Sequence, residues 1–255
     1  MGKVNLKDYN ALILCAGSGE RIKKLTTEPK CLLKINKSTI LQRNIKILKS
    51  KGIKNFSFVV GYKKEKIVNL IKKNFIKNIK YKFFNNLNFK NFGNAYSLYL
   101  GIRKNRKNIL IIDGDLVFQK EILDNITNMT KSGLLVGYGN INDEECAKTL
   151  IDKNGFIKKT IDKRHLSSFE KKKYIFDGEA IGIIILQRKD VLKLIKTCKK
   201  FFYFKKNLIL NWEKLINKYL ETNKLFSYKI KKIYKWVEID TYNDYCKAIK
   251  LFRKI

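Results

Sequence analysis

The sequence predicts an α/β fold: a mixed, mostly parallel β-sheet with helices on both faces and a small antiparallel hairpin insertion. Three observations predict it. Short apolar runs, typical of buried strands, alternate with amphipathic segments of helical period. A glycine-rich turn directly follows the first apolar run. No linker rich in proline, glycine or serine divides the 255 residues, of which 45% are hydrophobic, so residues 1–255 are expected to form a single domain.

The first half of the chain is expected to build the parallel part of the sheet. Its strands are expected at residues 11–14, 56–60, 79–84 and 108–112. Its helices are expected from residue 40 to Gly52, around residues 67–71, and over residues 95–102. Because a helix separates each strand from the next, right-handed crossovers and parallel pairing follow.

A hairpin is expected in the second half. Residues 147–151 and 156–160 are short strand-like runs joined by Asp152-Lys153-Asn154-Gly155. An Asn-Gly turn between two such runs predicts antiparallel pairing. We expect this hairpin to add antiparallel strands over the functional site.

The remaining elements are expected to complete the sheet and its helical layers. Strands are expected at residues 134–136, 180–186 and 230–233, and helices at 122–129, 190–198 and 208–220. Residues 236–241 are expected to close a short strand and to begin the last helix, with Asp240 or Thr241 as the N-cap. The lysines at 171–173 are expected to lie in an exposed loop.

The glycine-rich turn predicts a phosphate-binding loop. A buried strand that opens into Gly-Ser-Gly exposes several backbone N–H groups in one concave place. Arg21 and Lys30 add positive side chains there, and Pro29, the only proline of the chain, fixes the backbone just before Lys30. The loop residues expected to contact a nucleotide are Ala16, Gly17, Ser18 and Gly19.

Two common glycine motifs do not match this loop. A P-loop requires Gly-Lys followed by Ser or Thr, whereas Gly19 is followed by Glu20 and Arg21. A dinucleotide-binding fingerprint requires a third glycine, where this chain has Ile22. The loop is therefore of another kind.

Two acidic motifs follow predicted strands and indicate a metal site. Asp113-Gly114-Asp115 ends the strand at 108–112, and Glu238-Ile239-Asp240 ends the last short strand. In an open parallel sheet, ligands lie beyond the carboxyl ends of the strands, where the glycine loop also lies. Carboxylates from two strand ends can hold one hard divalent cation. Asp115 and Asp240 are expected to be the metal ligands, and Asp113 to have a supporting role.

Six motifs together resemble a known family. In chain order they are the glycine loop with Glu28-Pro29-Lys30, Val59-Val60-Gly61-Tyr62, Asn94-Ala95-Tyr96-Ser97-Leu98, Asp113-Gly114-Asp115, Gly178-Glu179-Ala180-Ile181-Gly182 and Glu238-Ile239-Asp240-Thr241. They resemble the phosphocholine cytidylyltransferase family. It belongs to the Rossmann-like nucleotidyltransferase fold of enzymes that activate sugar phosphates and phospho-alcohols, and this fold includes inositol-1-phosphate and phosphonate cytidylyltransferases.

The resemblance implies a reaction and roles for particular residues. It implies transfer of CMP from CTP to a phosphate monoester, with phosphocholine as the best guess for the acceptor. By resemblance, Arg21 and Lys30 hold the triphosphate and the attacking phosphate, and Asp115 and Asp240 hold Mg²⁺. The nucleotide is expected to be bordered by the loop and by Gly61, Asn94 and Ser97.

The sequence leaves the acceptor open. Choline phosphate requires aromatic faces and a nearby carboxylate, for which the candidates are Tyr96, Glu179, Trp236 and Trp212. An inositol or sugar phosphate requires groups that bind hydroxyls, for which Asn85, Asn86 and Asn91 are candidates.

The composition indicates a basic protein without a specific nucleic-acid partner. The formal net charge is +34, but the lysines are spread over the whole chain and no nucleic-acid-binding motif accompanies them. No segment is apolar over a length that would insert into a membrane. Five widely spaced cysteines suggest reduced thiols, so a cytoplasmic location is expected. The oligomeric state is left open.

Overall fold

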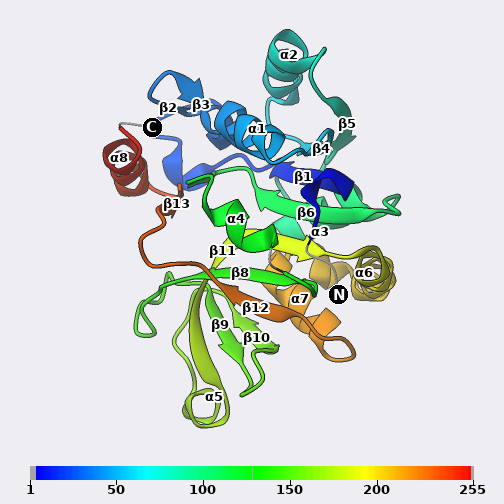
Figure 1. Ribbon diagram of the computed structural model, residues 1–255, viewed down its shortest axis with the longest axis vertical. Coiled ribbons are helices and arrows are strands. Elements are labelled where there is room, and N and C mark those ends of the chain that lie inside the picture. Colours follow the sequence, from blue (N-terminus) through cyan, green and yellow to red (C-terminus); the bar gives the residue numbers. More distant parts are fainter. Residues whose placement is uncertain (1–3, 128, 254–255) are drawn as a thin grey trace.

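A computed structural model describes residues 4–127 and 129–253 (Figure 1). Its centre is a nine-stranded sheet in which the strands follow the order β10-β9-β11-β6-β1-β4-β5, and β8 joins it by pairing with β11 and β12. The strands of the parallel half are β1 (Tyr9–Cys15), β4 (Asn55–Val60), β5 (Lys80–Asn85) and β6 (Asn108–Asp113). All four were expected near these bounds.

The parallel half is the most deeply buried part of the sheet. β1 lies between β4 and β6, with Leu12 opposite Ser57 on one side and Ile111 on the other. Leu12 and Ile13 are fully buried. Strands that are covered on both faces consist of continuous apolar runs, which is the pattern that predicted them.

The other half of the sheet is antiparallel, apart from β12, which pairs parallel with β8. Its strands are β8 (Gly133–Gly137), β9 (Lys148–Ile151), β10 (Ile157–Ile161), β11 (Ile175–Leu186) and β12 (Phe226–Lys229). The expected hairpin is present as β9 and β10. It extends the main sheet, because β9 also pairs with β11.

The strand β11 is longer than expected, and its direction had not been predicted. It begins at Ile175 rather than at residue 180, and it pairs antiparallel with β6. Hydrophobic periodicity identifies a strand but carries no information about its direction.

Helices cover both faces of the sheet (Figure 1). On one face lie α1 (Ile40–Ser50), α2 (Lys64–Phe75) and α4 (Ile122–Thr127), which share one apolar cluster with β1, β4 and β6. On the other face lie α3 (Asn94–Ile102), α6 (Arg188–Phe201) and α7 (Trp212–Leu220). The predicted fold class is thus confirmed. The helix expected over residues 122–129 includes residue 128, which lies outside the described residues.

Short elements position the functional site beyond the carboxyl end of β6. β7 (Leu116–Phe118) pairs antiparallel with β13 (Trp236–Glu238), which leads into α8 (Tyr242–Leu251) on the left of Figure 1. Thr241 is the N-cap of α8, in a capping box with Asp244. The remaining short elements are β2 (Lys34–Ile35), β3 (Ser38–Thr39), α5 (Ser168–Lys173) and the 3₁₀ turns η1 (Leu6–Asp8), η2 (Glu20–Ile22), η3 (Lys30–Leu32) and η4 (Lys205–Ile209).

Two expectations for the lysine-rich segments were wrong. The strand lies at Phe226–Lys229, before residues 230–233, where Ile230 is buried but Ile233 is 71% exposed. Lys171, Lys172 and Lys173 form the last turn of α5 rather than a loop, although they are exposed as expected. A capping box at the start of α5, formed by Ser167 and Glu170, favours the helix over a loop. In the described part of the chain no helix is long and apolar enough to cross a membrane.

Candidate active site

The glycine loop leaves β1 with its amide groups unpaired. Among the described residues, the backbone N–H groups of Gly17, Ser18 and Gly19 have no hydrogen-bond acceptor. Gly19 is in the left-handed region with φ +65° and directs the chain into η2. Free amides at the end of a buried strand can bind the oxygens of a polyphosphate.

Lys30 crosses under this loop to reach the acidic motifs. A Cβ atom on Gly19 would lie 2.7 Å from Cγ of Lys30, so the side chain of Lys30 packs directly beneath the loop. Its ammonium lies 2.7 Å from Oδ2 of Asp115 and 2.7 Å from Oδ1 of Asp240. It also donates to the carbonyl of Ile239 at 3.1 Å. The expected metal ligands Asp115 and Asp240 therefore lie together, with the ammonium of Lys30 between them.

A third carboxylate belongs to this group. Ligand oxygens of Asp115, Glu238 and Asp240 all lie within 4.8 Å of one another. The pairing of β7 with β13 explains the arrangement, because it places Glu238 opposite Leu116, the residue after Asp115. The motif Glu238-Ile239-Asp240 was predicted to contribute to a metal site, but Glu238 itself was not expected as a ligand. Its place two residues before Asp240, in the same acidic motif, was the signal that the sequence offered.

Burial and neighbouring charges shift the pKa values of Glu238, Asp240 and Lys30. Burial raises the pKa of Glu238 well above its usual range, and the charges of Asp115, Asp113 and Asp240 add to this. Burial also opposes ionisation of Asp240, but Lys30 outweighs it and holds the pKa of Asp240 below its usual range. For Lys30, burial disfavours the charged ammonium, but Asp115 and Asp240 outweigh this effect and raise its pKa.

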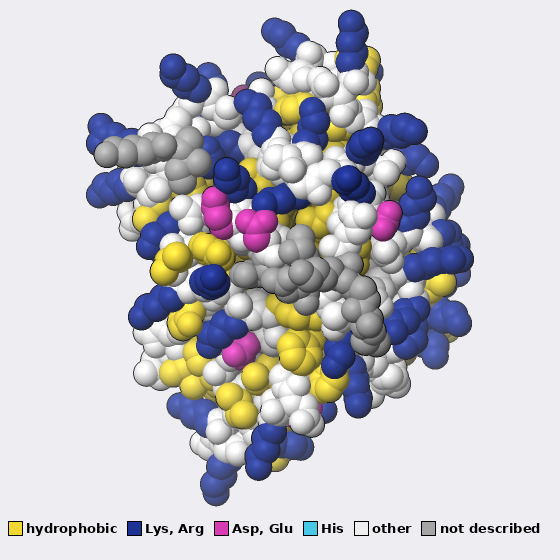
Figure 2. Space-filling view, in the orientation of Figure 1, with side chains coloured by type: hydrophobic (Ala, Val, Ile, Leu, Met, Phe, Trp, Pro, Cys, Tyr) yellow, Lys and Arg dark blue, Asp and Glu magenta, His cyan; other side chains and the backbone are white. Residues whose placement is uncertain are grey.

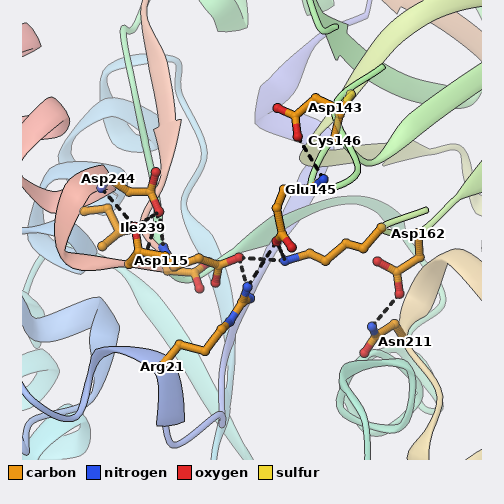
Figure 3. Close-up of polar contacts among 12 residues, drawn as sticks. Arg21, Asp115, Asp143, Glu145, Cys146, Asp162, Asn211, Ile239 and Asp244 are labelled. Carbon is orange, nitrogen blue, oxygen red and sulfur yellow. Dashed lines mark hydrogen bonds and ion pairs between the residues drawn. The ribbon is translucent and has the colours of Figure 1, made fainter. Parts of the chain in front are cut away.

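Arg21 reaches the same group from η2. Its guanidinium lies 2.6 Å from Oδ2 of Asp240 and 3.4 Å from Oε2 of Glu145. Lys163, in the loop after β10, contacts the same two side chains, Asp240 at 3.1 Å and Glu145 at 3.2 Å. Figure 3 shows Arg21 and Glu145 directed towards one another. Lys163 was not expected from the sequence, where it is one of 56 lysines and arginines without a distinguishing pattern.

The residues expected to border the nucleotide lie in two places. Ala16 and Gly61 are adjacent, since the amide of Tyr62 donates to the carbonyl of Ala16 and a Cβ atom on Gly61 would lie 2.7 Å from that oxygen. Asn94 and Ser97 lie on α3, and their side chains are engaged within the protein. Asn94 accepts a bond from the amide of Trp212 at 2.7 Å, and Ser97 accepts one from Asn86 at 3.0 Å.

Of the four candidates for contact with a choline acceptor, Trp212 is buried in an apolar cluster, and the other three are not all together. Glu179 pairs across the sheet with Gly137, and the indole of Trp236 packs on the same glycine. Burial raises the pKa of Glu179 to about 7, to which Asp143 also contributes. Tyr96 lies on α3, in a separate aromatic cluster with Phe92 and Phe202.

The chain is similar in sequence to a described family and to nucleotidyltransferases of known activity. Residues 28–252 match the family described as Domain of unknown function (DUF6564). A choline-phosphate cytidylyltransferase of Streptococcus pneumoniae is 31% identical over 137 residues, which cover 53% of this chain and 55% of the relative. A bifunctional IPC transferase and DIPP synthase of Aquifex aeolicus is 33% identical over 115 residues, or 45% of this chain and 26% of the relative. The chain thus spans between about a quarter and about half of the length of these curated relatives.

A solved structure matches nearly the whole chain. The CTP:phosphocholine cytidylyltransferase of Streptococcus pneumoniae superposes with a TM-score of 0.76 at 23% identity, over 96% of this chain and 99% of that one. At this identity the likeness concerns the fold. The resemblance inferred from the six motifs is confirmed by these matches. The chain belongs to the family described as Domain of unknown function (DUF6564), and it has the fold of the phosphocholine cytidylyltransferase-like nucleotidyltransferases.

Proposed function

We propose that this protein transfers CMP from CTP to a phosphate monoester, releasing pyrophosphate and forming a CDP-alcohol. The observation that carries this proposal is the convergence of Lys30, Arg21 and three carboxylates at the open end of the glycine loop. Unpaired amides and two cations suit a triphosphate, and the carboxylates suit the cation that accompanies it.

The chemistry requires positioning rather than a strong base. The second pKa of a phosphate monoester is about 6, so near neutral pH the attacking oxygen is already largely deprotonated. It attacks the α-phosphorus of CTP in line, a new P–O bond forms, and the bond to pyrophosphate breaks. Arg21 and the loop amides hold the triphosphate. Lys163, which shares Asp240 with Arg21, is positioned to approach the acceptor phosphate from the opposite wall.

The acidic group fits Mg²⁺. Asp115, Glu238 and Asp240 supply three hard oxygen ligands within 4.8 Å of one another, which is the donor type that this ion prefers. When bound, Mg²⁺ would neutralise charge on the phosphates and favour the departure of pyrophosphate. Lys30, which bridges two of these carboxylates, would then be free to turn its ammonium towards a phosphate.

The acceptor that we favour is a phosphate monoester with a positively charged head group, the class to which phosphocholine, the acceptor named from the sequence, belongs. Glu179 and Trp236, which meet at Gly137, combine a carboxylate with an aromatic face. Inositol 1-phosphate, a phosphonate or a sugar 1-phosphate are the alternatives. A nucleotide-binding regulatory module that lacks turnover is a second candidate function, but the complete set of charged groups argues against it.

Pyrophosphate release tests the proposal. The protein is incubated with Mg²⁺, each of the four NTPs, and a panel of phospho-alcohols and sugar phosphates. We expect CTP to be preferred, with turnover only when a phosphate monoester is present. Equal turnover of UTP or dTTP with a hexose 1-phosphate would contradict the cytidylyltransferase assignment, and CTP binding without any turnover would indicate the regulatory module.

A further inference from the structure

One oxygen of the Glu213 carboxylate is buried without a partner. Glu213 is the second residue of α7 and is only 7% exposed. Its Oε2 atom is shielded from solvent and has no hydrogen-bond partner among the described residues. Burial of an unpaired carboxylate costs free energy, and burial raises the pKa of Glu213 to about 7, with a contribution from Asp162.

The first turn of α7, which carries Glu213, is bonded to segments that border the candidate active site. Asn211, the N-cap of α7, donates to Asp162 at 2.7 Å (Figure 3), and the amide of Trp212 donates to Asn94. The hydroxyl of Thr160 donates to the carbonyl of Glu213 itself at 3.1 Å. The first turn of α7 is therefore fixed to the wall that carries Asp162 and Lys163.

Both nearby cations leave the carboxylate unpaired. The charged groups that act on Glu213 are Asp162, Lys163 and Lys214, and Glu213 in turn raises the pKa of Asp113. Lys163 directs its ammonium to Asp240 and Glu145. In a chain with 56 basic and 22 acidic residues, a buried acid without a cation is not explained by a shortage of cations.

We propose that Glu213 receives an N–H group of a protonated amine on the acceptor, so that the acceptor is an aminoalkyl phosphate rather than a trimethylammonium ester. This inference rests on the proposed function. An unpaired buried oxygen is satisfied only by a hydrogen-bond donor, and a trimethylammonium group has none. Asp162 adds negative charge near Glu213, which favours a cation over a neutral hydroxyl.

Three acceptors of matched skeleton test this role: 2-aminoethyl phosphate, choline phosphate and 2-hydroxyethyl phosphate. We expect the lowest KM for 2-aminoethyl phosphate. Glu213→Gln should raise this KM by about tenfold or more, with little effect on the 2-hydroxyethyl ester or on the KM for CTP. Glu221→Gln, on the exposed side of the same helix, is the control and should change none of these values.

Two further readouts separate this role from a structural one. Glu213→Gln removes an unpaired buried charge, so its thermal midpoint should equal or exceed that of the parent protein. If the carboxylate had a structural role, its replacement would lower the thermal midpoint. In the parent, the KM ratio of the amino to the hydroxyl ester should rise as the pH falls below about 7, because protonation removes the charge of Glu213, and this rise should vanish in the variant.

The outcomes distinguish the two proposals. Equal use of the three acceptors, or a uniform KM increase in Glu213→Gln, would overturn the role of Glu213 and leave the transferase function intact. No turnover of any phosphate monoester would overturn both.

Discussion

Lys30 connects the phosphate loop to the acidic group. Its stem packs under Gly19, and its ammonium bridges Asp115 and Asp240. A single side chain thus links the position of the loop amides to that of the carboxylates. Any change at these carboxylates is expected to act on the loop as well as on the metal.

The first prediction concerns the acidic residues. Asp115→Asn and Asp240→Asn should each reduce turnover by roughly a hundredfold or more, because each removes a charged ligand whose ion stabilises the transition state by several kcal/mol. Glu238→Gln should also reduce turnover. The measurement is steady-state pyrophosphate release as a function of Mg²⁺ concentration.

Asp113→Asn is the comparison for this prediction. Asp113 precedes the group and lies outside the set of three carboxylates, so its variant should lose less activity. Near-normal rates for Asp115→Asn or Asp240→Asn at saturating Mg²⁺ would show that the proposed ligand set is wrong.

At the scale of elements, the glycine loop and the α5 segment are each maintained by a local device. The loop depends on the left-handed backbone at Gly19. The segment after β10 depends on Glu170, whose side chain is 4% exposed and bonds Arg164 at 2.7 Å and Lys159 at 2.6 Å. Both devices fix loops that border the candidate site.

The second prediction is that Gly19→Ala lowers stability by about 1–2 kcal/mol, because a left-handed backbone disfavours a residue with a Cβ atom. The added methyl group would also lie 2.7 Å from Cγ of Lys30, so the KM for CTP should rise. Gly17→Ala is the control for stability, since no atom lies within 4 Å of its Cβ position. Urea unfolding of the two variants measures the difference, and equal stability would contradict the importance of this backbone conformation.

The third prediction is that Glu170→Gln destabilises the protein by about 1.5–3 kcal/mol near neutral pH, through loss of charged hydrogen bonds. The bond to Arg164, opposed by burial, holds the pKa of Glu170 below its usual value of 4.5. A lowered pKa means that the stabilisation is present above about pH 4.5 and is lost as the pH falls further. The difference in unfolding midpoint between parent and variant should therefore shrink from pH 7 to pH 3.

Glu221→Gln serves as the matched control. Its exposed ion pair with Lys218 should contribute less than about 0.5 kcal/mol. An effect of Glu170→Gln no larger than that of Glu221→Gln would contradict the prediction.

At the scale of the whole molecule, positive charge is spread over the surface rather than gathered in one patch. Figure 2 shows Lys and Arg side chains over all of the visible face, with few acidic ones among them. At the site, by contrast, three carboxylates, Asp115, Glu238 and Asp240, lie together. A basic surface thus surrounds a site in which carboxylates and cations are paired.

The fourth prediction follows from the net charge of +34. The protein should bind DNA fragments of unrelated sequence equally, and this binding should weaken by orders of magnitude between about 50 and 200 mM salt. Fluorescence anisotropy with two unrelated duplexes measures it. A sequence preference that persists at the higher salt would indicate a specific nucleic-acid partner.

Sequence alone determined the parts of this protein that depend on neighbouring residues. The apolar runs at β1, β4 and β6 predicted buried strands, and the Asn-Gly turn predicted the β9–β10 hairpin. The rule that ligands lie beyond the carboxyl ends of the strands predicted that Asp115 and Asp240 lie close together. The roles assigned to these residues remain predictions.

Only the tertiary structure decided which distant side chains meet. The antiparallel direction of β11, the approach of Glu238 and Lys163 to Asp240, and the unpaired Glu213 have no local signature. The structure also separates Tyr96 from Glu179 and Trp236, which the sequence had grouped by chemistry alone. The physical reason is that periodicity and turn chemistry act over a few residues, whereas strand direction, register and burial depend on how the whole chain packs.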